Sequence, residues 1–231
     1  MQKIIIIGFP HCGTTILRSI IGHIDSVKEI VKETQIIRKQ DMLNIKDNIK
    51  FILCKFPACR EIFFSEKYYD YIKILIVRNP FFVFSSLHKR NKSGKMNYDN
   101  FSAKLNTYVK TCEKYLFYKN NPSKNVYVIK YEDLFKDNFK KLKTILNNLK
   151  LDYTDEIFDN KLYTNRVTLK TKIPTSMPKE YNHAEYRSWQ INQLYINNNN
   201  IHNICLSDKE KKLITENTII KQLYTFDKNL H

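Results

Sequence analysis

A short glycine loop separates an apolar run from an amphipathic segment near the N-terminus. The loop reads GFPHCGTT, from Gly8 to Thr15, and follows a run of four isoleucines. Backbone N–H groups in such a loop, with the positive end of the helix that follows, commonly hold an anion. A loop that binds a nucleoside triphosphate with magnesium carries Lys before its final Ser or Thr, and Thr14 stands there instead. The loop therefore predicts an anion site that works without that lysine.

Basic side chains follow three other apolar runs. Lys55, Arg78 and Lys130 each come directly after a short run rich in Ile, Val or Leu. Open α/β sheets bind ligands beyond the carboxyl ends of their strands, so these cations and the loop are expected at one edge. Each cation alone could be a solvated turn lysine or a helix-start arginine. Their recurrence favours a shared site for a ligand with more than one anionic group.

These residues need a scaffold, and the apolar pattern predicts one. Four runs with little polar alternation read as buried parallel strands: Lys3–Ile7, Phe51–Cys54, Ile72–Val77 and Val126–Ile129. Helical patterns cover Thr14–His23, Cys59–Lys67, Phe81–Lys89, Tyr98–Tyr118 and Asn138–Leu149, and a capping box at Ser207 and Glu210 begins a last helix. Residues 159–205 read as largely irregular. The alternation predicts an α/β fold, a three-layer sandwich with a central parallel sheet, as one domain over 1–231.

Composition narrows the setting and the partners. The net charge is +16, which either attracts anions to the surface or reflects a lysine- and asparagine-rich composition. No apolar run approaches the ~18 residues of a membrane span, so no membrane anchor is expected. The five cysteines lack paired metal-ligand spacing, which indicates a reduced, cytoplasmic setting and no metal site. The oligomeric state is open.

Three segments resemble motifs of the sulfotransferases that use 3′-phosphoadenosine 5′-phosphosulfate (PAPS). GFPHCGTT resembles their loop, in which Pro and a basic residue precede Ser-Gly-Thr-Thr. VRNPFFVFSSLHKR resembles their second motif, an arginine with a serine eight positions later, here Arg78 and Ser86. VIKYEDLFKD resembles a third segment, and the three occur in family order within residues 3–140. The first segment is thus identified as a P-loop-like, phosphosulfate-binding loop.

The resemblance implies a role for each motif residue. Arg78 and Ser86 would hold the 3′-phosphate, and Tyr131 would lie beside that phosphate or the adenine. Lys55, in CKFP, resembles the lysine that steadies the charge between phosphate and sulfate. The product would be adenosine 3′,5′-bisphosphate (PAP), and positioning, donors and one base suffice without a metal. The loop residues implied in binding the 5′-phosphosulfate are Pro10, His11, Cys12, Gly13, Thr14 and Thr15.

A fourth segment, KETQIIRK, is similar to one in the tyrosylprotein sulfotransferases. By that match Glu33 is the catalytic base that takes the proton of the acceptor hydroxyl, although glutamates are common in such charge-rich stretches. Lys179, ten residues before Trp189, resembles a lysine that closes the cofactor site in that subfamily. Arg187 is a competing candidate for the same role.

Three positions depart from the family pattern. His11 stands where the family has Arg or Lys, and its protonated imidazole would stabilise the charge on the leaving phosphate. Gln35 replaces a substrate-binding arginine. Cys54 stands where some carbohydrate sulfotransferases carry a glutamate base, which leaves Glu33 as the base.

The predicted function is transfer of a sulfuryl group from PAPS to a hydroxyl of a protein tyrosine, a carbohydrate or a small molecule. The alternative is a P-loop nucleotide-dependent kinase of a small molecule. It lacks the loop lysine, although Glu132 or Asp133 could hold its magnesium. A nucleic-acid-binding module would need an aromatic–basic recognition motif, which the sequence lacks, so such binding would be nonspecific and salt-sensitive.

Overall fold

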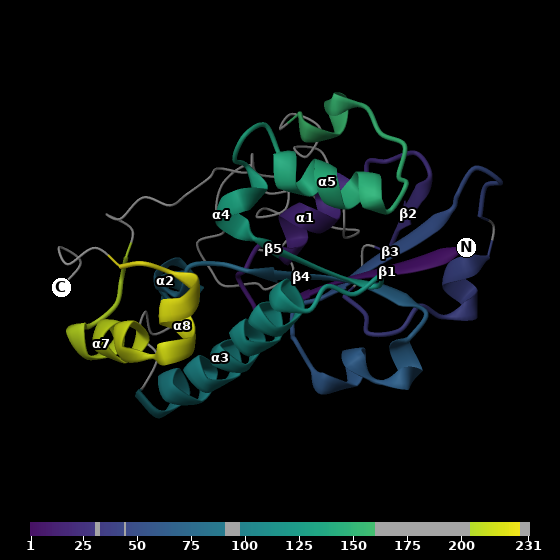
Figure 1. The fold of residues 1–231 in the computed structure, drawn as a ribbon. Coiled ribbons are helices and arrows are strands. Elements are labelled where there is room, and N and C mark those ends of the chain that lie inside the picture. The colour runs from purple at the N-terminus through teal and green to yellow at the C-terminus, as the bar shows by residue number, and fades with distance from the viewer. Residues whose placement is uncertain (31–32, 44, 91–97, 160–203, 227–231) are drawn as a thin grey trace.

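The computed structural model describes residues 1–30, 33–43, 45–90, 98–159 and 204–226. Its centre is a five-stranded sheet in the order β2-β3-β1-β4-β5, with every pair parallel (Figure 1). The strands are β1 (Gln2–Gly8), β2 (Val27–Glu29), β3 (Phe51–Phe56), β4 (Tyr71–Val77) and β5 (Val126–Lys130). The predicted α/β fold with a central parallel sheet is confirmed.

Helices cover both faces of this sheet. Figure 1 shows α1, α4 and α5 on one face and the long α3 on the other. The α-helices are α1 (Thr14–Ile21), α2 (Pro80–Arg90), α3 (Tyr98–Asn120), α4 (Tyr131–Leu134), α5 (Lys140–Asn148), α7 (Asp208–Glu216) and α8 (Thr218–Leu223). The described residues also contain four 3-10 turns: η1 (Lys39–Met42), η2 (Glu61–Phe64), η3 (Glu66–Tyr68) and η4 (Asp155–Phe158).

The central strands are apolar because both of their faces are covered. Ile4 to Ile7 of β1 have no exposed surface, and all seven residues of β4 are buried. At the start of the loop that follows β1, the ring of Phe9 contacts the rings of Phe84 and Tyr108, whose centroids are 5.8 and 5.5 Å from its own. The start of the loop is therefore anchored in the core.

The register of the sheet aligns the strand ends. Ile6 of β1 pairs with Lys55 of β3, Gly8 of β1 pairs with Ile76 of β4, and Val77 pairs with Lys130 of β5. Because all strands run the same way, the segments that follow them start from one edge, where α/β proteins bind ligands.

One predicted helix is wrong. Cys59–Lys67 does not form an α-helix but contains η2 and η3, with Ser65 in an extended conformation between them. The Ser65 hydroxyl donates to the Ile62 carbonyl over 2.6 Å, a local bond that competes with a continuous helix.

The last predicted helix divides into two. The capping box at Ser207 and Glu210 is present and begins α7, as predicted. The Asn217 side chain then accepts from the N–H groups of Ile219 and Ile220 and begins α8. Short elements were also missed, β2 and α4 among them, because three or four residues carry little periodicity.

The irregular stretch predicted at 159–205 lies mostly outside the described residues. No helix within the described ranges is long and apolar enough to cross a membrane.

Candidate active site

The loop between β1 and α1 has a backbone that requires glycine at one position. His11 and Gly13 have positive φ angles of 69° and 96°. A Cβ atom on Gly13 would also lie 2.4 Å from Cδ2 of Tyr131, far inside contact distance. Glycine at position 13 therefore satisfies both the left-handed backbone and the close approach of the tyrosine ring.

The loop leads directly into α1, which begins at Thr14. The first N–H groups of a helix have no partner within it, and they favour an anion together with the helix dipole. The Cys12 N–H, by contrast, donates to the Phe9 carbonyl over 3.1 Å, and Pro10 has no N–H to offer. Candidate donors for the predicted anion site therefore include the N–H groups of Gly13, Thr14 and Thr15.

The two motif segments meet at His11. Its Nδ1 atom lies 2.7 Å from Oγ of Ser86, a residue 75 positions away. The Arg78 guanidinium donates to the His11 carbonyl through Nη1 over 3.4 Å. The structure thus brings together the loop and both residues of the Arg–Ser motif.

The ring of Tyr131 packs against the guanidinium of Arg78. The guanidinium carbon of Arg78 lies 4.2 Å from the centre of the Tyr131 ring, a cation–π contact. Burial raises the pKa of the Tyr131 hydroxyl, so the ring is neutral near pH 7. The Tyr108 hydroxyl, which the sequence did not single out, donates to the Arg78 carbonyl over 2.6 Å. These contacts hold Arg78 in place from both its side chain and its backbone.

Glu33 lies beside Lys55. Lys55 Nζ is 2.5 Å from Glu33 Oε1, and the two side chains are 1% and 41% exposed. Backbone bonds guide this meeting, because the N–H groups of Ile30 and Thr34 donate to the carbonyls of Leu53 and Lys55. Ile30 and Thr34 therefore lie alongside β3, and Glu33 lies next to the lysine. The predicted strand ended two residues too early, since β3 runs to Phe56 and Lys55 lies inside it.

Other predicted candidates have different surroundings. Lys130 donates to the Leu223 carbonyl and lies 4.7 Å from the Tyr224 ring centre, so its partners are in the C-terminal segment. Cys12 is fully buried, and burial raises the pKa of its thiol well above the usual range. Lys179 lies outside the described residues, as do Arg187 and Trp189.

The carboxylates considered for a kinase metal are engaged elsewhere. Glu132 accepts the Asn79 N–H over 2.6 Å, and burial raises the pKa of the Glu132 carboxyl. Asp133 forms ion pairs with Lys136 and Lys141. Within the described ranges, no group of three His, Cys, Asp or Glu side chains is arranged to hold a metal ion.

Known protein structures share this fold. No curated protein sequence matches the chain significantly. A mouse sulfotransferase, SULT7A1, solved in complex with PAP, has the same fold with a TM-score of 0.58 and 18% identity, covering 93% of this chain and 82% of its own. The sulfotransferase domain of the curacin biosynthetic pathway gives 0.52 and 15% over 96% of this chain and 97% of its own. The sulfotransferase domain of the Synechococcus PCC 7002 olefin synthase gives 0.51 and 16% over 72% and 78%.

A family model gives the assignment that these distant structures cannot give alone. The model of the sulfotransferase domain matches residues 1–196, a range that includes all the motif segments. It confirms the family that the three motifs predicted. This chain belongs to the sulfotransferase domain family.

Proposed function

We propose that this chain transfers a sulfuryl group from PAPS to an acceptor hydroxyl and releases PAP. The observation that carries the proposal is the junction at His11, whose ring contacts Ser86 and whose carbonyl accepts from Arg78. The junction places the loop that would bind one anionic group next to Arg78 and Ser86, which would bind a second one. Such a donor set fits a ligand with anionic groups at both ends, as PAPS has, and the PAP complex of the mouse sulfotransferase supports the choice.

The two ends of the ligand would be held by different elements. The N–H groups of Gly13, Thr14 and Thr15 would take the 5′-phosphosulfate at the start of α1. Arg78 and Ser86 would take the 3′-phosphate, with the planar guanidinium supplying charge-assisted hydrogen bonds. We also propose, on the family resemblance alone, that Lys179 closes the cofactor site.

Sulfuryl transfer then needs one bond made, one broken and one proton moved. The acceptor oxygen forms a bond to sulfur while the bond from sulfur to the 5′-phosphate oxygen breaks. The hydroxyl proton goes to the Glu33 carboxylate, which is exposed enough to meet an acceptor. Lys55 and protonated His11 stabilise the negative charge that gathers on the departing phosphate.

The burial of Lys55 makes it suited to that role. A charge that is 1% exposed acts through a medium less polar than water, so its attraction for a developing anion is stronger than at the surface. Glu33 balances this charge in the free protein at 2.5 Å. The same pair thus supplies both the cation and the base that the reaction needs.

A ligand-binding experiment tests the proposal against the kinase alternative. PAP at about 100 times its Kd should stabilise the protein by about 2.7 kcal/mol, which appears as a higher Tm. ATP with magnesium should give a smaller shift. The reverse order would favour the kinase. Labelled PAPS offered with a tyrosine peptide, a sugar series and small phenols then identifies the acceptor class.

The cellular setting is a separate proposal. We propose a reduced, cytoplasmic location, which is supported by the free thiols of all five cysteines.

A further inference from the structure

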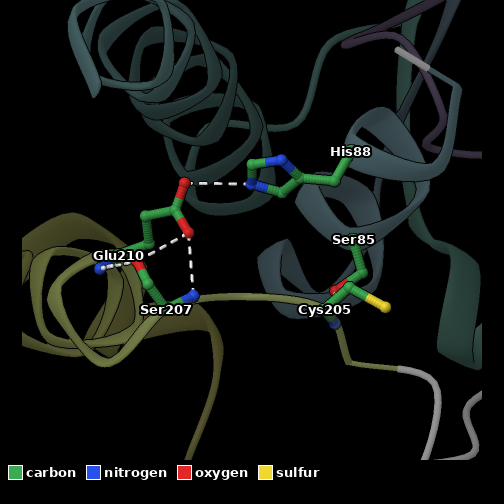
Figure 2. Close-up of polar contacts among 5 residues, drawn as sticks. All are labelled: Ser85, His88, Cys205, Ser207 and Glu210. Atoms are coloured by element: carbon green, nitrogen blue, oxygen red, sulfur yellow. Dashed lines mark hydrogen bonds and ion pairs between the residues drawn. The ribbon is translucent and has the colours of Figure 1, made fainter. Parts of the chain in front are cut away.

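The C-terminal segment 204–226 packs against the helix that carries Ser86. Figure 2 shows the residues through which this segment contacts α2. The Cys205 N–H donates to Oγ of Ser85 over 2.9 Å, and Nε2 of His88 lies 2.9 Å from Oε1 of Glu210. Cys205 and Glu210 lie beyond residue 196, where the family match ends.

Glu210 uses its two oxygens for different tasks. Oε1 faces His88, whereas Oε2 accepts the N–H and the hydroxyl of Ser207, each over 2.8 Å (Figure 2). The side chains of His88 and Glu210 are 4% and 9% exposed, so the pair is shielded from water. Burial makes such a polar contact expensive to break, because a buried group without its partner keeps its full desolvation cost.

Further contacts fasten the same segment to the core behind the loop. The Phe226 ring lies 4.9 Å from the ring of Phe81, at the start of α2. Lys130 at the end of β5 donates to the last carbonyl of α8, that of Leu223. The segment is therefore fixed at α2 and at β5, the two elements that flank the Arg78–Tyr131 contact.

Two adjacent residues of α2, Ser85 and Ser86, contact different parts of the chain. Ser85 is held by the C-terminal segment, while Ser86 is held by His11 of the loop. His88 lies within one turn of both. A displacement of α2 on its C-terminal side would therefore move the Ser86 hydroxyl relative to Arg78 and His11.

We infer that His88 and Glu210 are positioning residues for the 3′-phosphate site: they hold α2 so that Ser86 is placed to bind that phosphate. The inference rests on the proposed function, in which Ser86 contacts the 3′-phosphate. It also assigns a function to the segment 204–226, namely to set the selectivity of the cofactor site for a 3′-phosphorylated nucleotide.

Titration calorimetry with two nucleotides tests this role. PAP carries the 3′-phosphate and adenosine 5′-monophosphate lacks it, so the ratio of their affinities reports the 3′ site alone. His88→Leu should weaken PAP binding by about tenfold, the size of one charge-assisted hydrogen bond, and leave the monophosphate within about twofold. His88→Gln, which keeps a donor at similar reach, should restore most of the ratio.

A matched control separates positioning from general stability. Asn217→Ala removes the cap of α8 in the same segment without touching α2, and should lower the Tm by about 2–4 °C with the ratio unchanged. If His88→Leu does not fold, Glu210→Met, which keeps the length of the side chain and removes both acceptor oxygens, replaces it. An unchanged ratio in the folded variant, with wild type preferring PAP, overturns the inference. A wild-type protein without that preference contradicts the proposed function and this inference with it.

Discussion

Replacement of Arg78 by Met separates the charge of this residue from its packing. The Arg78 guanidinium carbon lies 4.2 Å from the ring centre of Tyr131 and 5.7 Å from that of Phe82. Met keeps an unbranched apolar side chain that can still lie against both rings. Arg78→Met therefore removes the positive charge and the donors while it leaves most of the buried apolar contact.

The expected losses differ between the free protein and the complex. In the free protein the variant loses a cation–π contact worth about 0.5–2 kcal/mol. The bond from Nη1 to the His11 carbonyl is long at 3.4 Å, so it adds little. In the complex it also loses charge-assisted hydrogen bonds to the 3′-phosphate, worth about 1.5–3 kcal/mol. That corresponds to a loss of about 10- to 150-fold in PAP affinity.

Calorimetry with PAP and adenosine 5′-monophosphate measures the loss of affinity in the complex, and the Tm of the free variant measures the loss of stability. PAP affinity should fall as stated, and monophosphate affinity should change by less than about threefold, because the group that Arg78 binds is missing from it. Arg60→Met is a matched control, since the Arg60 guanidinium carbon lies 5.1 Å from the Phe56 ring. Equal losses for the two nucleotides would refute the 3′-phosphate role of Arg78 and indicate that it only supports the site.

Three further predictions concern the base, the loop backbone and the loop histidine. Glu33→Gln should keep PAP affinity and lower turnover by about 10²–10⁴-fold, as measured with labelled PAPS and the identified acceptor; near-normal turnover would assign the base elsewhere. Gly13→Ala should lower both the Tm and PAP affinity, because its Cβ would lie 2.4 Å from Tyr131 in a backbone with φ of 96°; a variant with wild-type Tm and affinity would contradict that loop geometry. PAP affinity should decrease from about pH 6 to about pH 8.5 as the imidazole of His11 loses its proton, and His11→Arg should flatten this dependence; parallel pH curves would show that His11 carries no charge in the site.

The local pattern of the sequence was enough for the main elements of the fold. The run at Ile4–Ile7 is continuous and β4 is apolar from Ile74 to Val77, because both faces of those strands are covered, and this leaves a clear signal. The pattern failed at Cys59–Lys67, where aromatic residues suggest an apolar face. There the Ser65 side chain bonds locally and interrupts the helix.

Some residues of the candidate site could likewise be predicted from the sequence, and others could not. The loop and Arg78 could be found because they follow strand ends, and Ser86 because its segment resembles a family motif. The contacts of Tyr108 with Arg78 and of Glu210 with His88 could not be found, since a buried tyrosine or a capping glutamate on a helix has many possible partners.

The amino-acid sequence alone indicates the longer strands and helices, since the apolar pattern of a segment is a local property of the chain. It also dictates that this loop lacks the lysine of a triphosphate site. Only the folded chain decides that His11 meets Ser86 and that Glu33 meets Lys55. These meetings depend on the order of the strands, in which β1 lies between β3 and β4 although neither follows it directly along the chain. That order is set by packing of the whole core, and no local pattern encodes it.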